Sequence, residues 1–87
     1  MTGTDSTGHV FVEVDNVRIT YVPSRDRTAA ANWAGSDVIR VQAKKGHGDA
    51  LHMGAEFPVA DEMAFVRLIE GICQVYREGR GAVVASQ

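Results

Sequence analysis

The chain has 87 residues, a formal net charge of −2 at pH 7 and a single cysteine. Its composition, 45% apolar and 23% charged, is ordinary for a globular protein and excludes the intrinsically disordered class. The length allows one small hydrophobic core. We expect a single domain over residues 9–79, with flexible tails over residues 1–8 and 80–87, because both ends lack a periodic apolar pattern.

Targeting and membrane signals are missing from the sequence. No apolar run approaches the roughly 18 residues of a membrane span, and residues 1–8 do not carry a basic stretch followed by an apolar one. Cys73 has no second cysteine with which to form an internal disulfide. We therefore predict a cytoplasmic protein that does not enter a membrane. Because so small a domain has a thin margin of stability, we also expect a homodimer.

Apolar and polar residues alternate over residues 9–22, which predicts strand structure. The alternation shifts phase at Asp15–Asn16, which marks either a tight hairpin turn or a bulge in one long strand. We favour two strand segments with a sharp kink between them. The residues on the apolar side are Val10, Val12, Val14, Val17, Ile19 and Tyr21.

Residues 28–34 fit two structures. Their three alanines, between Ser24 as an N-cap and Gly35 as a C-cap, suit a short helix. Alternation around Trp33 equally suits a strand that returns to pair with the preceding one, which is the interpretation we favour. A lone tryptophan in a small domain is more often core than surface, and the sequence leaves both open for Trp33.

Residues 38–44 and 51–57 alternate clearly and predict two further strands, antiparallel to each other and joined by a turn over residues 46–49. Ile39, Val41 and Ala43 face inward on the first of them. The inward residues of the second are Leu51, Met53, Ala55 and Phe57.

After Pro58 the apolar spacing becomes that of an amphipathic helix, which we expect to end at Gly79. Gly71, inside this helix, indicates a close backbone approach, either to the sheet or to a second copy of the helix. The predicted fold class is α+β, a four-stranded antiparallel β-meander followed by one C-terminal amphipathic helix packed on the sheet.

No arrangement of residues typical of catalysis is present. His9, His47 and His52 lack metal-ligand spacing. Cys73 lies on the apolar stripe of the helix, where a free cysteine is usually buried and inert. The sequence contains no phosphate-binding glycine motif and no nucleophile with an orienting partner. We predict no enzymatic activity, no cofactor and no metal.

The polar side of the predicted sheet is the candidate functional surface. Inward placement of the apolar series turns Arg18 outward, where it joins the outward residues of the neighbouring strand. Such cations can follow a phosphate backbone, and an aromatic side chain beside them can stack on bases. The candidate nucleic-acid-binding residues are Arg18, Arg25, Arg27, Trp33, Arg40, Gln42, Lys44 and Lys45.

The order of the elements resembles the β-β-β-β-α repeat of the Pur-alpha type, as a layout. The likeness covers the strand residues His9 to Val22, the strands ending at Lys45 and Phe57, and the helix carrying Phe65, Ile69 and Tyr76. That family binds single-stranded nucleic acid as a dimer of repeats, so the resemblance implies the same ligand class. We predict a small non-enzymatic binding protein that contacts single-stranded DNA or RNA. The alternative is a protein-interaction or regulatory accessory module acting as a homodimer.

Overall fold

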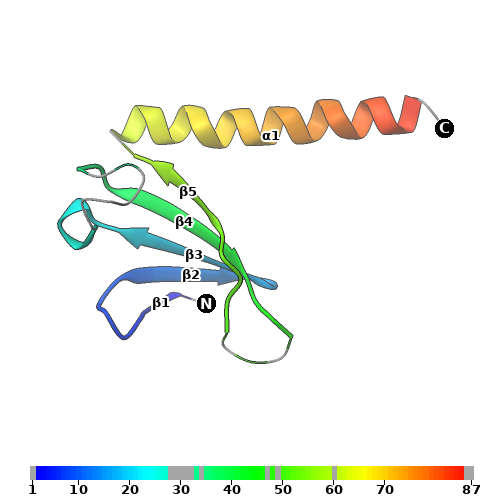
Figure 1. Cartoon of the computed structure of the whole chain (residues 1–87). Helices are drawn as coiled ribbons and strands as arrows, with labels where there is room; N and C mark the ends of the chain where they lie inside the picture. Colours follow the sequence, from blue (N-terminus) through cyan, green and yellow to red (C-terminus); the bar gives the residue numbers. More distant parts are fainter. Residues whose placement is uncertain are drawn as a thin grey trace.

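The structure is a computed structural model that describes residues 2–27, 33, 35–46, 48, 50–59 and 61–85. It consists of a five-stranded antiparallel sheet and one long C-terminal helix (Figure 1). The strands lie in chain order across the sheet, each paired with the next. They are β1 (Thr2–Thr4), β2 (Val10–Val14), β3 (Val17–Val22), β4 (Val38–Ala43) and β5 (Ala55–Pro58), with a 3-10 turn, η1 (Ser24–Asp26), after β3 and the helix α1 (Glu62–Ala85) at the end.

The predicted α+β class and antiparallel sheet are confirmed, but the sheet has five strands instead of four. The additional strand is β1, which lies in the segment we expected to be a tail and pairs with β2. Its Gly3 lies opposite Phe11, and a Cβ at Gly3 would be only 3.0 Å from the Phe11 ring. The Phe11 ring therefore requires a glycine at position 3. Because glycine is not apolar, the segment shows no alternating apolar pattern, and the sequence does not reveal that it is a strand.

The phase shift at Asp15–Asn16 is a tight hairpin turn. Val14 pairs with Val17, so the chain reverses completely between β2 and β3. Asp15 has a φ of 53°, the left-handed conformation that two-residue hairpin loops use. The sharp kink that we favoured is thus a full reversal between two paired strands.

The strand predicted for residues 28–34 has no place beside β3. Both edges of β3 are occupied, one by β2 and the other by β4 from Val22–Val38 to Val17–Ala43. Residues 28–32 and 34 lie outside the described residues. Trp33 lies in a turn with a φ of 62° and is 52% exposed, which answers the open question in favour of the surface.

The strand β4 closely follows its predicted range, whereas β5 begins later than expected, at Ala55. Before it, Leu51 is joined to Lys44 only by an isolated bridge. A Cβ at Gly54 would lie 1.8 Å from the Val41 carbonyl oxygen, so only glycine lets the chain approach β4 this closely. Of the predicted turn over residues 46–49, His47 and Asp49 lie outside the described residues.

The strand registers divide the sheet into an apolar face and a polar face. On the apolar face Val12, Ile19, Val41 and Ala55 lie side by side across four strands, as the alternation predicted. The buried side chains, however, are on the polar face: Phe11, Thr20, Val22 and Val38.

This placement of the core reverses the expected one, in which the apolar face is buried. The physical reason is that, among the described residues, the polar face is covered more completely than the apolar face, which only the first turns of α1 cover. Arg18 lies over the Phe11 ring, and Arg27, which follows η1, reaches across to Glu56. Long charged side chains can bury apolar surface along their stems while their charged ends are paired.

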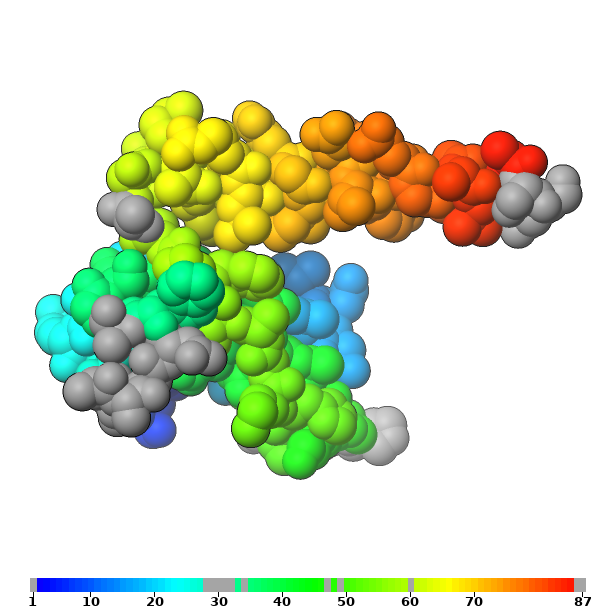
Figure 2. All heavy atoms as spheres, turned by 45° about the horizontal axis from the view of Figure 1, so that its top comes forward, coloured from blue at the N-terminus to red at the C-terminus, as the bar shows by residue number. Residues whose placement is uncertain are grey.

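Packing of α1 on the sheet is limited to the first turns, which corrects the predicted close packing. Among the described residues of α1 none is buried, and only Ala64, Phe65 and Leu68 are half-buried. Figures 1 and 2 show the helix starting at the end of β5 and extending well beyond the sheet. The helix continues past Gly79 to Ala85, and Cys73 is exposed, since none of the described elements covers it.

Candidate functional site

Two clusters on the polar face each contain one glutamate shared by two cations. In the first, Glu13 Oε2 accepts hydrogen bonds from Lys44 Nζ at 2.7 Å and from Arg18 Nη2 at 3.2 Å. The Arg18 guanidinium carbon also lies 4.3 Å from the centre of the Phe11 ring. The Lys44 hydrogen bond, with that of Arg18, lowers the pKa of Glu13 from its ordinary value. Glu13 is thus held as a carboxylate by Arg18 of β3 and by Lys44, which directly follows β4.

The second cluster joins Glu56 on β5 to two arginines. Arg27 binds Glu56 in bidentate fashion, with Nη1 2.9 Å from Oε2 and Nη2 3.1 Å from Oε1. Arg40, directly opposite Glu56 in the β4–β5 register, contributes its Nε at 2.9 Å. The Arg27 side chain is only 4% exposed, and its hydrogen bonds are the largest cause of the lowered pKa of Glu56. This cluster fixes the segment after η1 to the sheet.

Four of the candidate nucleic-acid-binding cations are therefore engaged in ion pairs within the chain. Together the clusters hold four cations and two carboxylates, an excess of two positive charges. Gln42 lies opposite Arg18 on the same face, and its side-chain amide donates to the His52 carbonyl at 3.2 Å. Sequence reasoning brought the cations to one face but missed the role of Glu13 and Glu56 as their partners. The signal was the strand register, which places each glutamate beside an arginine.

Two further candidates, Arg25 and Lys45, lie outside these clusters. Arg25 belongs to η1, and Lys45 follows β4; both are exposed. The Lys45 N–H donates to the Ala50 carbonyl at 2.8 Å, a backbone contact of the β4–β5 connection. The two residues do not add to the paired charges of the polar face.

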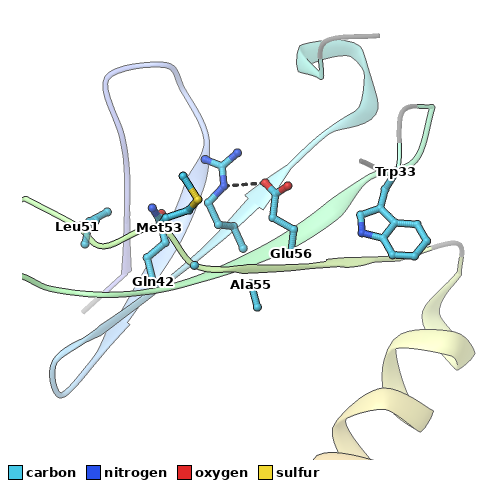
Figure 3. A pocket seen from close by; sticks show the side chains of 8 residues that line it. Trp33, Gln42, Leu51, Met53, Ala55 and Glu56 are labelled. Carbon is cyan, nitrogen blue, oxygen red and sulfur yellow. Dashed lines mark hydrogen bonds and ion pairs between the residues drawn. The ribbon is translucent and has the colours of Figure 1, made fainter. Parts of the chain in front are cut away.

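An open hollow of about 810 Å³ lies beside the second cluster (Figure 3). Figure 3 shows Trp33 at one end and Met53 with Leu51 toward the other, while the ion pair of Glu56 lies between them. Ala55 and Glu56 point to opposite faces of the sheet in this view, with α1 on the side of Ala55. The hollow is lined by Trp33, Arg40, Gln42, Leu51, Met53, Gly54, Ala55 and Glu56.

A second, smaller hollow of about 300 Å³ surrounds His9. His9 Nε2 lies 2.8 Å from Asp26 Oδ2, and Nδ1 lies 3.1 Å from Thr7 Oγ1. The Thr7 hydroxyl donates its proton to Asp5 at 2.6 Å, which is the largest cause of the lowered pKa of Asp5. An activated nucleophile donates its hydroxyl proton to a histidine, which a carboxylate orients. The Thr7 hydroxyl instead donates its proton to Asp5, so Thr7, His9 and Asp26 are not arranged as such a group. The group links the β1–β2 connection to η1.

Tyr21 and Asp37 form a third polar contact, between β3 and the residue before β4. The Tyr21 hydroxyl donates to Asp37 Oδ2, while Asp37 Oδ1 accepts the backbone N–H of Ser24 at 2.7 Å. The hydrogen bond raises the pKa of Tyr21 and lowers the pKa of Asp37. This contact holds η1 against the sheet.

Apolar side chains are exposed both on the sheet and along α1. On the sheet Val10 is 56% exposed, Val14 51% and Tyr21 40%. We call the apolar surface the exposed residues Val10, Val12, Val14 and Tyr21 of the sheet together with Val66, Ile69, Ile72, Val75, Tyr76, Val83 and Val84 of α1.

Within the described ranges no group of three or more His, Cys, Asp or Glu side chains is placed to hold a metal ion. In the same part of the chain no helix combines the length and apolar character needed to cross a bilayer. Comparisons with protein-family models, curated proteins and solved structures found no match to this chain.

Proposed function

We propose that the chain is a protein-interaction module that works as a homodimer through its apolar surface. The observation that carries the proposal is α1, a 24-residue helix with no buried residue along its described length. An amphipathic helix gains most of its stability by packing its apolar stripe. Exposed apolar patches on this scale mark interaction sites in soluble proteins.

The dimensions of the chain support this proposal. Its accessible surface is 6477 Å², against about 5,000 Å² for a compact monomer of its mass. Its radius of gyration is 15.3 Å, where a compact chain of this length has about 12 Å. The excess surface, about 1,500 Å², is larger than the about 800 Å² that one partner contributes to a standard interface. A second copy supplies the missing cover with the same surface on both sides.

Sedimentation equilibrium over a hundredfold concentration range tests the proposal. We expect a dimer for the natural chain and a monomer for Ile72→Asp, which introduces a charge into the apolar stripe of α1. Gln74→Asp adds the same charge to the polar side of α1 and is expected to leave the dimer intact. Because α1 contributes no buried residue, both variants are expected to keep the strand circular-dichroism signal. A natural chain that sediments as a monomer throughout would refute the proposal.

A second candidate function, binding of single-stranded nucleic acid, is favoured by one observation. The two clusters of the polar face carry an excess of two positive charges, and the exposed Trp33 borders the hollow beside them. Phosphate neutralisation and base stacking are the two contributions such binders use. The shared glutamates reduce the charge available to a phosphate backbone, so this function ranks second.

Fluorescence anisotropy with labelled single-stranded DNA and RNA tests the second candidate. Binding is expected to weaken between about 50 mM and about 200 mM salt, and to be lost in the double variant Arg40→Ala, Lys44→Ala. The double variant Arg67→Ala, Arg77→Ala removes the same charge from α1 and serves as the matched control. No binding at either salt concentration would exclude this function.

A further inference from the structure

Apolar and small residues of α1 recur at a seven-residue spacing, which is more specific than the apolar stripe of an ordinary amphipathic helix. Such spacing keeps one seam of a helix facing a second helix along its whole length. Of the charged residues of α1 only Glu62, in the first turn, lies at such a position, seven residues before Ile69; the others fall outside the seam. The seam consists of three series, Phe65, Ile72 and Gly79; Leu68, Val75 and Ala82; and Ile69, Tyr76 and Val83.

The chain itself leaves most of this seam open. Only Phe65 and Leu68 of the seam are half-buried, and every residue from Ile69 to Ala85 is exposed. A Cβ placed on Gly71 or Gly79 would meet nothing within 4 Å, so neither glycine serves a close approach inside the chain. Each glycine nevertheless costs the helix about 1 kcal/mol relative to alanine. Of the two explanations for Gly71, packing on the sheet is therefore not supported, which leaves a second copy of the helix.

We infer that two copies of the chain pair through α1 in antiparallel orientation, with Ile72 packed against Val75 of the second copy. The inference rests on the proposed homodimer and specifies its interface. In this register Phe65 lies opposite Ala82 of the second copy, and Leu68 lies opposite Gly79. Each layer then combines a large side chain with a small one, the arrangement by which facing positions fill space evenly.

Parallel pairing of the same seam does not fill space in this way. It places Phe65 against Phe65 at one end, which crowds the helices, and Gly79 against Gly79 at the other, which leaves a gap. Antiparallel helices also align their macrodipoles favourably. The order of large and small side chains along the seam thus favours the antiparallel orientation.

The antiparallel arrangement also covers the exposed sheet. Each sheet is attached at the N-terminal end of its own α1, and the C-terminal half of that helix extends beyond it (Figures 1 and 2). In the pair this half lies beside the N-terminal half of the second helix and therefore over the second sheet.

Distances between nitroxide spin labels test the orientation. The natural Cys73 is the only cysteine, is exposed, and lies beside the centre of the proposed pair. Met63 is 61% exposed on the opposite side of the helix from the seam, and the variant Cys73→Ala, Met63→Cys moves the label there. With a rise of 1.5 Å per residue, antiparallel pairing separates the two positions 63 by about 32 Å along the axis.

We expect a long distance for labels at position 63 and a short one, under about 20 Å, for labels at Cys73. Dilution with unlabelled protein must reduce both signals, since both are between chains. A distance of only about 20 Å at position 63, the lateral separation of two outward-facing positions at the same level, would show parallel pairing, since the antiparallel pair adds the axial offset and gives about 38 Å. Long distances at both positions would show an interface away from α1. Either result overturns the inference while the homodimer stands. A monomer by sedimentation overturns the proposed function itself.

Discussion

Replacing Gly54 by alanine is expected to separate β5 from β4 near the start of their pairing. The added Cβ would lie 1.8 Å from the Val41 carbonyl oxygen and 2.7 Å from its carbonyl carbon, both backbone atoms that cannot rotate away. Ordinary contact begins at 3.4 Å, so the chain has to move by about 1.6 Å. A shift of that size breaks the strand hydrogen bonds on both sides of Gly54.

The magnitude follows from the bonds that are lost. Val41 pairs with Ala55 on one side of Gly54, and the His52 N–H donates to the Ala43 carbonyl at 2.8 Å on the other. Two or three backbone hydrogen bonds, each about 1 kcal/mol net, give a loss of about 2–3 kcal/mol. For a domain of this size that corresponds to a decrease in Tm of roughly 10–20 °C.

Thermal and urea unfolding followed by circular dichroism measure the effect. The matched control is Gly81→Ala, which changes a glycine on the polar side of α1 whose Cβ would meet nothing within 4 Å. Because alanine is the better helix former, the control is expected to gain up to about 1 kcal/mol. A Gly54→Ala variant with the Tm of the natural chain would show that the approach of Gly54 to Val41 is not a constraint of the fold.

Three further predictions concern the polar contacts and the first hairpin. Since the folded chain lowers the pKa values of Glu13 and Glu56, their stabilising effect is complete above about pH 4.3, the ordinary glutamate pKa, and is lost as the pH falls through the lowered values. Urea midpoints between about pH 6 and about pH 3 should therefore fall, and Glu56→Gln should reduce the slope. Asp15→Val forces a β-branched residue into a φ of 53° and is expected to cost about 1–2 kcal/mol in urea unfolding, whereas Asp15→Gly costs nothing; equal midpoints for the two variants would contradict this. Tyr21→Phe removes the hydroxyl bonded to Asp37 and should cost about 0.5–1.5 kcal/mol in the same assay. In a chain that already carries Asp37→Ala, the same substitution should cost almost nothing, because the hydrogen bond is already absent.

The sheet was largely predictable because alternation depends only on local chemistry. Val17, Ile19 and Tyr21 on β3 and Ile39 and Val41 on β4 share one face, as their period of two required. The α1 helix was equally clear from its period of 3.6 as far as Gly79, whereas its continuation to Ala85 lies in a segment that we expected to be a tail. The strand β1 was missed because Gly3, which makes room for Phe11, carries no apolar signal.

The location of the core was not predictable in this way. An apolar series indicates a surface that has to be covered, but not what covers it. In this chain the apolar face stays largely open, while the stems of Arg18 and Arg27 help to cover the polar face. Which cation meets Glu13 or Glu56 depends on contacts between strands that are distant in sequence, so the paired state of the candidate site could not be read from spacing alone.

Because each glutamate is shared between two cations, the cations of the polar face tolerate substitution better than the glutamates do. If Arg18 is replaced, Lys44 still holds Glu13, and if Arg40 is replaced, Arg27 still holds Glu56. Each cation therefore has a substitute. Loss of either glutamate instead brings two positive charges face to face. Over many generations we expect the arginines and lysines of this face to drift, while positions 13 and 56 keep their acidic residues.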